Sequence, residues 1–379
     1  MRCHFSFAVR GTIMEIDLEM VAKRVVKDAL RLREGDSLGV HTYEHSLPLA
    51  KEIVKAARRA GADTILTTDS DDVWYEALLK LPVDWLKERS SLLQAVLRAT
   101  TALVSLDGPE DPSRMRDIAA ERWRANEQGA TATWKPFEER GVRSVSLEIS
   151  RVTEARARAY GFDYGEWHGS TLKAMTVDPK TLRERGNCVI KSLKGVRRGR
   201  LTAPGGTDLR FEFHGASPTL WTGEVRPVKG RKSTYHGSLP SGMVGIALRQ
   251  GSGEGRVVST TPIAQFGEFI KGLRWTFDGG RMTKVDAKEH LDFFNALWVE
   301  SKRKKGADQL GSLSIGLNPE ARFGFLNNEI VEGCITLAIG DNEHLGGTNR
   351  CQYSFPVSFK DANLEVNGRR IVVGGRLKV

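Results

Sequence analysis

The chain has 379 residues, of which 40% are hydrophobic and 27% charged, and its formal net charge is +10 at pH 7. This length allows two domains, the composition is typical of globular proteins, and no apolar run approaches the roughly 18 residues of a membrane span. Two basic runs stand out, 191–200 and 302–305, and both lack interleaved aromatic residues for base stacking. We therefore expect neither a nucleic-acid partner nor a membrane partner.

The N-terminus and the cysteines both favour a cytoplasmic location. Arg10 interrupts the apolar patch of the N-terminal segment, which also lacks a clear signal-peptide cleavage pattern. Met14 is an alternative start, and residues 1–13 would then be an N-terminal extension. The four cysteines are widely spaced and form no CxxC pair, which argues against a disulfide framework; they are Cys3, Cys188, Cys334 and Cys351.

Helical and strand patterns alternate in the first half of the chain. Apolar residues at helical spacing predict helices over 15–32, 47–60, 73–79, 91–99 and 114–128. Short apolar runs predict strands over 37–40, 64–68, 102–106 and 142–147. Strands that alternate with helices form a parallel, doubly wound sheet, so residues 14–182 are predicted to be an α/β Rossmann-like domain.

The pattern changes after about residue 182. Short β-rich runs between Gly, Ser, Pro and Asp turns predict strands over 188–193, 200–202, 209–213, 244–248, 256–260 and 273–277, with one helix over 287–304. Near the C-terminus, 335–339 and 353–359 are two further predicted strands. Residues 183–379 are therefore predicted to be a mainly antiparallel, β-rich (α+β) domain that carries the site.

Two local motifs are similar to known sites but occur in a different context. His41-Thr-Tyr-Glu-His45 matches the H-x-x-E-H zinc pattern, which needs both histidines on one helix face. Here His41 is expected at the end of a strand, so a polar loop is favoured, and substrate contact by either histidine stays open. Gly251-Ser-Gly-Glu-Gly255 is similar to a phosphate loop, but no helix follows it, and a hairpin turn is favoured.

Several motifs together resemble the aminopeptidase T (AmpS/PepS) family of metallopeptidases. They are 47–50 (LPLA) with 55–62 (KAARRAGA), 175–182 (MTVDPKTL), 201–209 (LTAPGGTDL), 239–242 (LPSG), 314–319 (SIGLNP), and 337–342 (LAIGDN) with Gly346-Gly347. Each motif alone is weak, whereas their order and spacing are specific. The resemblance implies an N-terminal α/β domain, a β-rich C-terminal domain that holds two divalent metals, and a homodimer.

The resemblance also implies five metal ligands, and this chain has other residues at the matching positions. The family uses two glutamates, two histidines and an aspartate. The matching positions here are Met243, Ser312, Thr336, Ser354 and Pro356. Thioether, hydroxyl and prolyl groups do not replace the charge of carboxylates or the basicity of imidazoles. We therefore expect no metal cofactor; if one is bound, it is a divalent ion (Zn, Co, Mn or Fe).

The resemblance then predicts a site lined mainly by uncharged groups. The predicted substrate-binding residues are Met243, Ser312, Thr336, Ser354 and Arg350. The candidate acid–base residues for metal-free chemistry are Tyr353, His344 and Glu343. Glu343 and His344 are alternatively replacement metal ligands, and more distant candidates for that role are His236, Glu320 and His290.

Three functional hypotheses share this scaffold. The first is an enzyme of aminopeptidase T ancestry with changed chemistry, a hydrolase by resemblance, which acts on a small-molecule or peptide-like substrate of amide or aromatic type. The second is a non-catalytic binding protein. The third is an active metallo-aminopeptidase whose ligands lie at other positions. A related branch, resembling 2,5-dihydroxypyridine dioxygenase, uses one iron, but its closing His-x-Asp is replaced here at Ser354 and Pro356.

Overall fold

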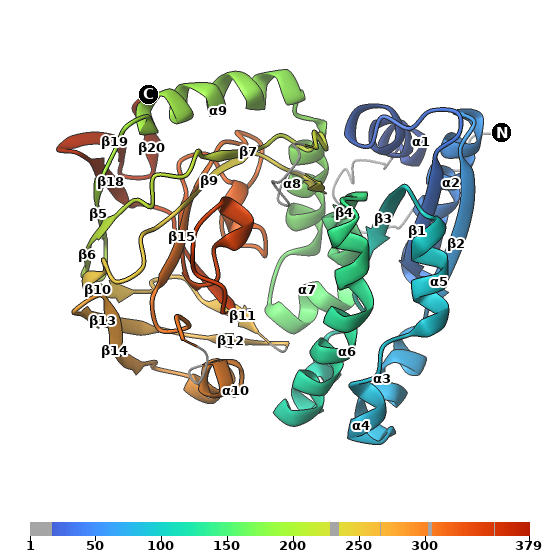
Figure 1. The fold of residues 1–379 in the computed structure, drawn as a ribbon, viewed down its shortest axis with the longest axis horizontal. Coiled ribbons are helices and arrows are strands. Elements are labelled where there is room, and N and C mark those ends of the chain that lie inside the picture. Colours follow the sequence, from blue (N-terminus) through green and yellow to red (C-terminus); the bar gives the residue numbers. More distant parts are fainter. Residues whose placement is uncertain (1–16, 228–234, 266, 302–304, 352) are drawn as a thin grey trace. The chain divides into compact units, whose positions relative to one another are not determined.

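The computed structural model describes residues 17–227, 235–265, 267–301, 305–351 and 353–379, which form two compact units (Figure 1). The first unit spans Met1–Thr176 and Gly223–Pro240, and the second spans Val177–Thr222 and Ser241–Val379. The alternative start at Met14 and the basic residues 302–304 lie outside the described residues. The domain boundary near residue 182, the homodimer and the cytoplasmic location stay predictions.

The first unit is built on a parallel sheet with the strand order β2-β1-β3-β4-β8. All four neighbouring pairs run parallel, which confirms the predicted α/β fold of this part. The edge strand β8 comes from a segment for which no strand was predicted. The strands are β1 (Ser37–Tyr43), β2 (Asp63–Asp69), β3 (Ala102–Leu106), β4 (Arg143–Leu147) and β8 (His236–Leu239).

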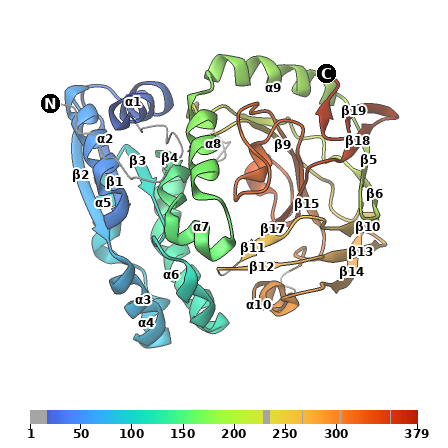
Figure 2. The same cartoon turned by 180° about the vertical axis from the view of Figure 1, so that it is seen from behind.

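The helices of the first unit lie beside this sheet (Figures 1 and 2). They are α1 (Leu18–Lys23) with the π-helical turn Arg24–Ala29, α2 (Leu47–Arg59), α3 (Asp71–Lys80), α4 (Val83–Leu86), α5 (Ser91–Ala99), α6 (Ala120–Glu139), α7 (Glu154–Tyr160) and α8 (Tyr164–Thr176). Right-handed crossovers in this strand order place α2 on one face of the sheet and α5 and α6 on the other. Leu97 of α5 and Phe137 of α6 pack with Leu103 of β3 on that second face. Within the described ranges, no helical segment has both the length and the hydropathy that a bilayer-spanning helix requires.

The second unit contains two large antiparallel sheets, which confirms its predicted β-rich character. Their strand orders are β14-β13-β10-β6-β5-β18-β19-β20 and β17-β16-β15-β9-β7. The larger sheet comprises β5 (Arg198–Ala203), β6 (Thr207–Glu212), β10 (Glu254–Val258), β13 (Arg274–Asp278), β14 (Arg281–Asp286), β18 (Asn363–Val366), β19 (Arg369–Val373) and β20 (Arg376–Leu377). The smaller sheet comprises β7 (Thr219–Trp221), β9 (Met243–Ala247), β15 (Leu310–Gly316), β16 (Ile335–Gly340) and β17 (Ser354–Phe359). A separate hairpin pairs β11 (Ile263–Gln265) with β12 (Glu268–Ile270).

A single apolar core joins the two large sheets of the second unit. Leu209 of the larger sheet and Leu313 of the smaller sheet belong to the same buried cluster. Two helices, α9 (Pro179–Leu193) and α10 (Leu291–Ser301), add further buried side chains, among them Phe294 of α10. Because alternate residues of the five-stranded sheet point into this core, the residues between them lie on its other face.

Two local predictions about the second unit are wrong. Residues 188–193 are not a strand but the last turns of α9, in which Val189 and Leu193 are buried along one helix face. Periodicity does not distinguish a short apolar run in a helix from a buried strand. The turn at 251–255 is not a hairpin, because it leads from β9 in the smaller sheet to β10 in the larger sheet.

Candidate functional site

The five-stranded sheet of the second unit has one face in the apolar core and one face outside it. Leu313, Leu337 and Val357, on three adjacent strands, belong to the buried apolar cluster. Successive side chains of a strand point to opposite faces, so their neighbours in the sequence lie on the second face, called the outer face below. The strand registers place these residues on the outer face: Met243, Gly245, Ala247, Ser312, Ser314, Gly316, Thr336, Ala338, Ser354, Pro356 and Ser358.

All five positions that match the family's metal ligands lie on this outer face, but they are not equally close to one another. Ser312 and Thr336 are on neighbouring strands, one side-chain row apart, which is a diagonal of about 7–8 Å. Met243 and Ser354 are three rows apart, or about 20 Å along the strands at about 6.8 Å per row. The centre of the candidate site is therefore at Ser312 and Thr336, with Pro356 in the same row as Ser312.

Hydroxyl groups concentrate at this centre. Ser314 and Ser358 are the direct cross-strand neighbours of Thr336, and the Thr336 and Ser358 hydroxyl oxygens are 2.8 Å apart. Thr336 is 6% exposed, whereas Ser312, Ser314 and Ser358 are half-buried. Ser314 and Ser358 were not among the predicted site residues. The even spacing of the serines at 312 and 314, and at 354 and 358, which places each pair on one face of a strand, was the signal that could have identified them.

The Cys334 thiol lies beside these hydroxyls. It is 1% exposed, and burial raises its pKa to about 12, although hydrogen bonds with Thr336 and Ser358 act in the other direction. A thiol with this pKa is neutral at pH 7 and is not a nucleophile. Thr336, Ser358 and Cys334 therefore present only neutral hydrogen-bonding groups. Cys188, Cys334 and Cys351 are all free cysteines.

Two buried asparagines fix the loop 341–351 against the edge of the five-stranded sheet. Asn342 donates through Nδ2 to the carbonyl oxygens of Leu248 and Gly311, at 3.0 and 2.8 Å, and its Oδ1 accepts from the Asn349 N–H at 2.9 Å. Asn349 in turn donates to two further backbone carbonyl oxygens, at 2.9 and 2.7 Å. Both side chains are 0% exposed. The hydrogen bonds of these two buried side chains to backbone groups thus hold the loop in place, and its exposed residues are not needed for this.

Leu345 brings this loop over the outer face. An added Cβ at Gly245 would lie only 2.6 Å from Trp221 of β7 and 3.3 Å from Leu345, so a larger residue at this position would collide with the indole ring. Gly245 is also the cross-strand neighbour of Ser314. Trp221 and Leu345 therefore cover the outer face next to the hydroxyl cluster.

The candidate acid–base residues Glu343 and His344 flank Leu345 and remain accessible. Their side chains are 43% and 47% exposed in the 3-10 turn Glu343–Leu345. Glu343 Oε1 is 3.2 Å from Arg350 Nε, and His344 Nδ1 is 3.9 Å from Asp341 Oδ1. The structure thus brings Arg350 to Glu343, where its 72% exposed side chain forms a surface ion pair.

Tyr353 lies on the core side of the sheet. Its side chain belongs to the apolar cluster together with Phe355, whereas Ser354 between them is on the outer face. Its buried hydroxyl has no hydrogen-bond partner among the described residues. Burial raises the pKa of Tyr353 far above its ordinary value, so the phenol stays neutral.

The other candidate histidine ligands lie in different elements of the fold. His41 is in β1 and His45 is in the 3-10 turn Glu44–Ser46, so the two do not share a helix face, as predicted. His236 is in β8, with Nδ1 3.0 Å from the Ser144 hydroxyl. The ring of His290 stacks on Phe293, with centroids 4.9 Å apart. In the part of the chain that the structure describes, no three His, Cys, Asp or Glu side chains are arranged to hold a metal ion.

The fold is shared with two solved structures. Wild-type AmpT from Thermus thermophilus matches with a TM-score of 0.75 and 16% identity over 96% of this chain and 99% of its own. The 2,5-dihydroxypyridine dioxygenase from Pseudomonas putida KT2440 matches with a TM-score of 0.60 and 14% identity over 95% of this chain and 96% of its own. At these identities, the matches show the fold alone.

Sequence comparison adds the family. Aminopeptidase PepS of Streptococcus thermophilus is 22% identical over 302 residues, which cover 72% of this chain and 70% of that protein. The family model described as thermophilic metalloprotease (M29) matches residues 14–152 and 180–339. Since these ranges include most of the chain, the protein belongs to the thermophilic metalloprotease (M29) family.

Proposed function

We propose that this chain is an aminopeptidase-like protein that has lost the two-metal site and binds a small, neutral amide-type or aromatic substrate at its outer face. The observation that carries the proposal is the chemistry of the five positions that match metal ligands: Met243, Ser312, Thr336, Ser354 and Pro356. A pair of divalent cations requires anionic carboxylates and neutral imidazoles. One thioether, three hydroxyls and a proline do not fit such a pair.

The hydroxyl cluster suits a peptide-like group instead. Each hydroxyl both donates and accepts, so the cluster matches the N–H and the carbonyl oxygen of an amide. The Thr336 and Ser358 hydroxyls already hydrogen-bond to each other. Those of Ser312 and Ser314 make no hydrogen bond to another described residue, which leaves them available to a ligand. A neutral ligand also avoids the cost of an unpaired charge on this uncharged surface.

Glu343 and His344 are the residues that we propose move a proton in this chemistry. Leu345 anchors their turn over Gly245, beside the hydroxyl cluster, while both side chains stay accessible. A carboxylate and an imidazole are the side chains most often used as general acid and base. If neither is needed, the same surface serves a binding protein, and the kinetics described below separate the two roles.

Protein purified without chelator is expected to contain far less than one equivalent of zinc, cobalt, manganese or iron per chain. The physical reason is the missing countercharge at the five matched positions. Mass-spectrometric metal analysis checks this result, and EDTA should leave the melting temperature unchanged. About two equivalents per chain would contradict the proposal and favour an active metallo-aminopeptidase. About one iron would favour an oxygenase-like site.

Glu343→Ala and His344→Ala are each expected to lower the turnover of an amide substrate by about 100-fold, the lower end of general acid–base contributions. Leucyl-arylamides and simple arylamides are the substrates to screen, with steady-state kinetics as the measurement. Glu184→Ala, on the exposed face of α9, is the matched control and should change nothing. If both variants turn over like the wild type, the acid–base assignment is wrong. If the wild type binds these amides without turnover, the chain is a binding protein.

A further inference from the structure

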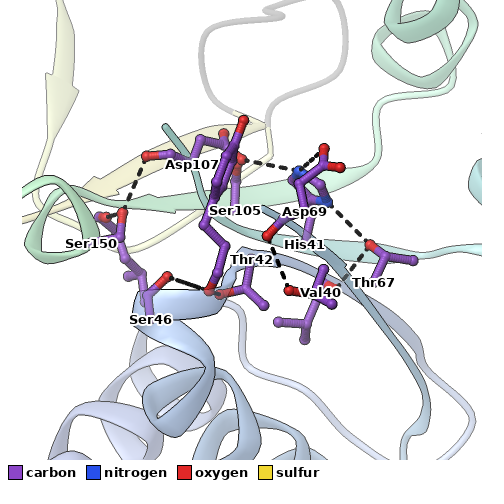
Figure 3. A network of polar contacts seen from close by, with 12 residues as sticks. Val40, His41, Thr42, Ser46, Thr67, Asp69, Ser105, Asp107 and Ser150 are labelled. Atoms are coloured by element: carbon purple, nitrogen blue, oxygen red, sulfur yellow. Dashed lines mark hydrogen bonds and ion pairs between the residues drawn. The ribbon is translucent and has the colours of Figure 1, made fainter. Parts of the chain in front are cut away.

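The carboxyl edge of the parallel sheet in the first unit collects polar side chains from three adjacent strands (Figure 3). His41 is near the end of β1, Asp69 ends β2 and Asp107 follows β3. His41 Nε2 lies 4.0 Å from Asp69 Oδ2 and 3.9 Å from Asp107 Oδ1. The chain departs in opposite directions from β1 and β3, and open parallel sheets bind ligands at such a switch point.

Hydrogen bonds fix the orientation of the His41 ring. The Thr67 hydroxyl donates to the Val40 carbonyl oxygen at 3.4 Å and therefore accepts from His41 Nδ1, which is 3.1 Å away. In the neutral ring Nδ1 then carries the proton, and Nε2 points its lone pair toward Asp69 and Asp107. Separations of 3.9 and 4.0 Å exceed hydrogen-bond distance, so three acceptors surround a gap that has room for a donor.

The carboxylates of Asp69 and Asp107 both have free acceptor positions. Asp107 Oδ2 accepts from the Ser105 hydroxyl, which leaves Oδ1 facing His41. Asp69 uses its carboxylate only in the contact with His41, and neither aspartate has an arginine or lysine partner among the described residues. The nearby Asp71 differs, because both of its carboxylate oxygens accept backbone N–H groups. The negative charge at the edge is therefore not neutralised by a cationic side chain of the described chain.

Tyr43 adds a hydroxyl without a hydrogen-bond partner among the described residues. The residue is 5% exposed, and its hydroxyl makes no hydrogen bond to a described residue. Its ring is edge-on to the His41 ring, with centroids 6.1 Å apart. Burial raises the pKa of Tyr43, and the charges of Asp69 and Asp107 raise it further, which puts the hydroxyl within electrostatic reach of both. The hydroxyl can therefore accept a hydrogen bond from a bound donor.

We propose that His41, Asp69, Asp107 and Tyr43 form a binding site for a small molecule that carries a primary ammonium group. Such a group has one positive charge and three N–H donors, which match two carboxylates and the lone pair of His41. If an ammonium nitrogen lies about 2.8 Å from each of two acceptors that are 3.9 Å apart, the acceptor–nitrogen–acceptor angle is about 90°. A metal ion bonded at about 2.1 Å would need an angle of about 135°, which fits neither tetrahedral nor octahedral coordination.

The test is a titration of the full-length protein with n-butylamine, followed by the NMR signal of the His41 ring, which a His41→Gln variant identifies. A saturable shift is expected. Asp69→Asn and Asp107→Asn should each weaken the apparent affinity about tenfold, because each removes one charge-assisted hydrogen bond. Tyr43→Phe should weaken it about threefold, as expected for one hydrogen bond to a neutral group.

The controls separate charge, donors and position. Asp84→Asn removes an exposed carboxylate of α4 that pairs with Lys87, and it should bind the amine like the wild type. The probe 1-butanol lacks the charge and tetramethylammonium lacks the N–H donors, so neither should saturate the site. The proposal is overturned if n-butylamine gives no saturable shift, if 1-butanol binds equally well, or if Asp69→Asn retains full affinity. Saturation by Mg²⁺ or Zn²⁺ without any response to the amine would overturn it as well.

Discussion

Replacing Asn342 by alanine is expected to lower the free energy of unfolding by about 3–4 kcal/mol and to loosen the loop 341–351 over the outer face. The Asn342 amide is fully buried and bonds three backbone groups, those of Leu248, Gly311 and Asn349. Alanine leaves these groups without that partner, at about 1–3 kcal/mol each. The Gly311 carbonyl oxygen keeps its bond from the Leu248 N–H at 2.9 Å, which places the total at the lower end of that range.

Urea unfolding measures the loss of stability, and hydrogen exchange of the backbone amides in the loop 341–351 measures how far the loop loosens. Asn187→Ala is the matched control, because Asn187 is exposed on α9 and makes no hydrogen bond to another described residue. The control should change the free energy of unfolding by less than about 0.5 kcal/mol. A loss below about 1 kcal/mol for Asn342→Ala would show that the loop is held by other contacts, such as that of Leu345 with the outer face.

The regular elements of the first unit were largely predictable because their signals are local. The helix predicted over 47–60 is α2, and the strand predicted over 102–106 is β3, since an amphipathic period and a short apolar run each lie within one segment. The helix predicted over 114–128 corresponds instead to a 3-10 turn and α6, which begins at Ala120. Strand β8 had no local signal, because its four residues His236–Leu239 (HGSL) include only one apolar side chain. Its pairing with β4, which lies far away in the sequence, forms only in the folded sheet.

The candidate sites were predictable only in part, because they depend on strand register and strand order. The motif spacing identified Ser312 and Thr336, but it did not show that Ser358 is the cross-strand neighbour of Thr336. The approach of Asp69 and Asp107 to His41 depends on β1 lying between β2 and β3. No local sequence pattern indicates which strands become neighbours, because strand order is established only when the sheet folds.

A carboxylate introduced at Thr336 is expected to lower the free energy of unfolding by about 3 kcal/mol at pH 7, compared with Thr336→Asn, which has the same size and no charge. Thr336 is 6% exposed, and its neighbours Ser358 and Cys334 are neutral. A carboxyl group buried without a cation has its pKa raised by about 2–3 units, and each unit corresponds to about 1.4 kcal/mol. Urea unfolding of Thr336→Asp and Thr336→Asn at pH 7 and pH 4 measures the difference.

The pH dependence follows from the direction of that shift. The introduced carboxyl has a higher pKa in the folded state than its unfolded value of about 3.9, so the folded state holds its proton more tightly. The destabilisation of Thr336→Asp is then complete above the folded-state pKa and disappears as the pH falls below about 4. If the outer face still held a divalent cation, that ion would neutralise the new carboxylate, and Zn²⁺ would restore stability at pH 7. If the two variants have equal unfolding free energies at pH 7 and EDTA then destabilises only Thr336→Asp, a cation is present there, and the proposed loss of the metal site is wrong.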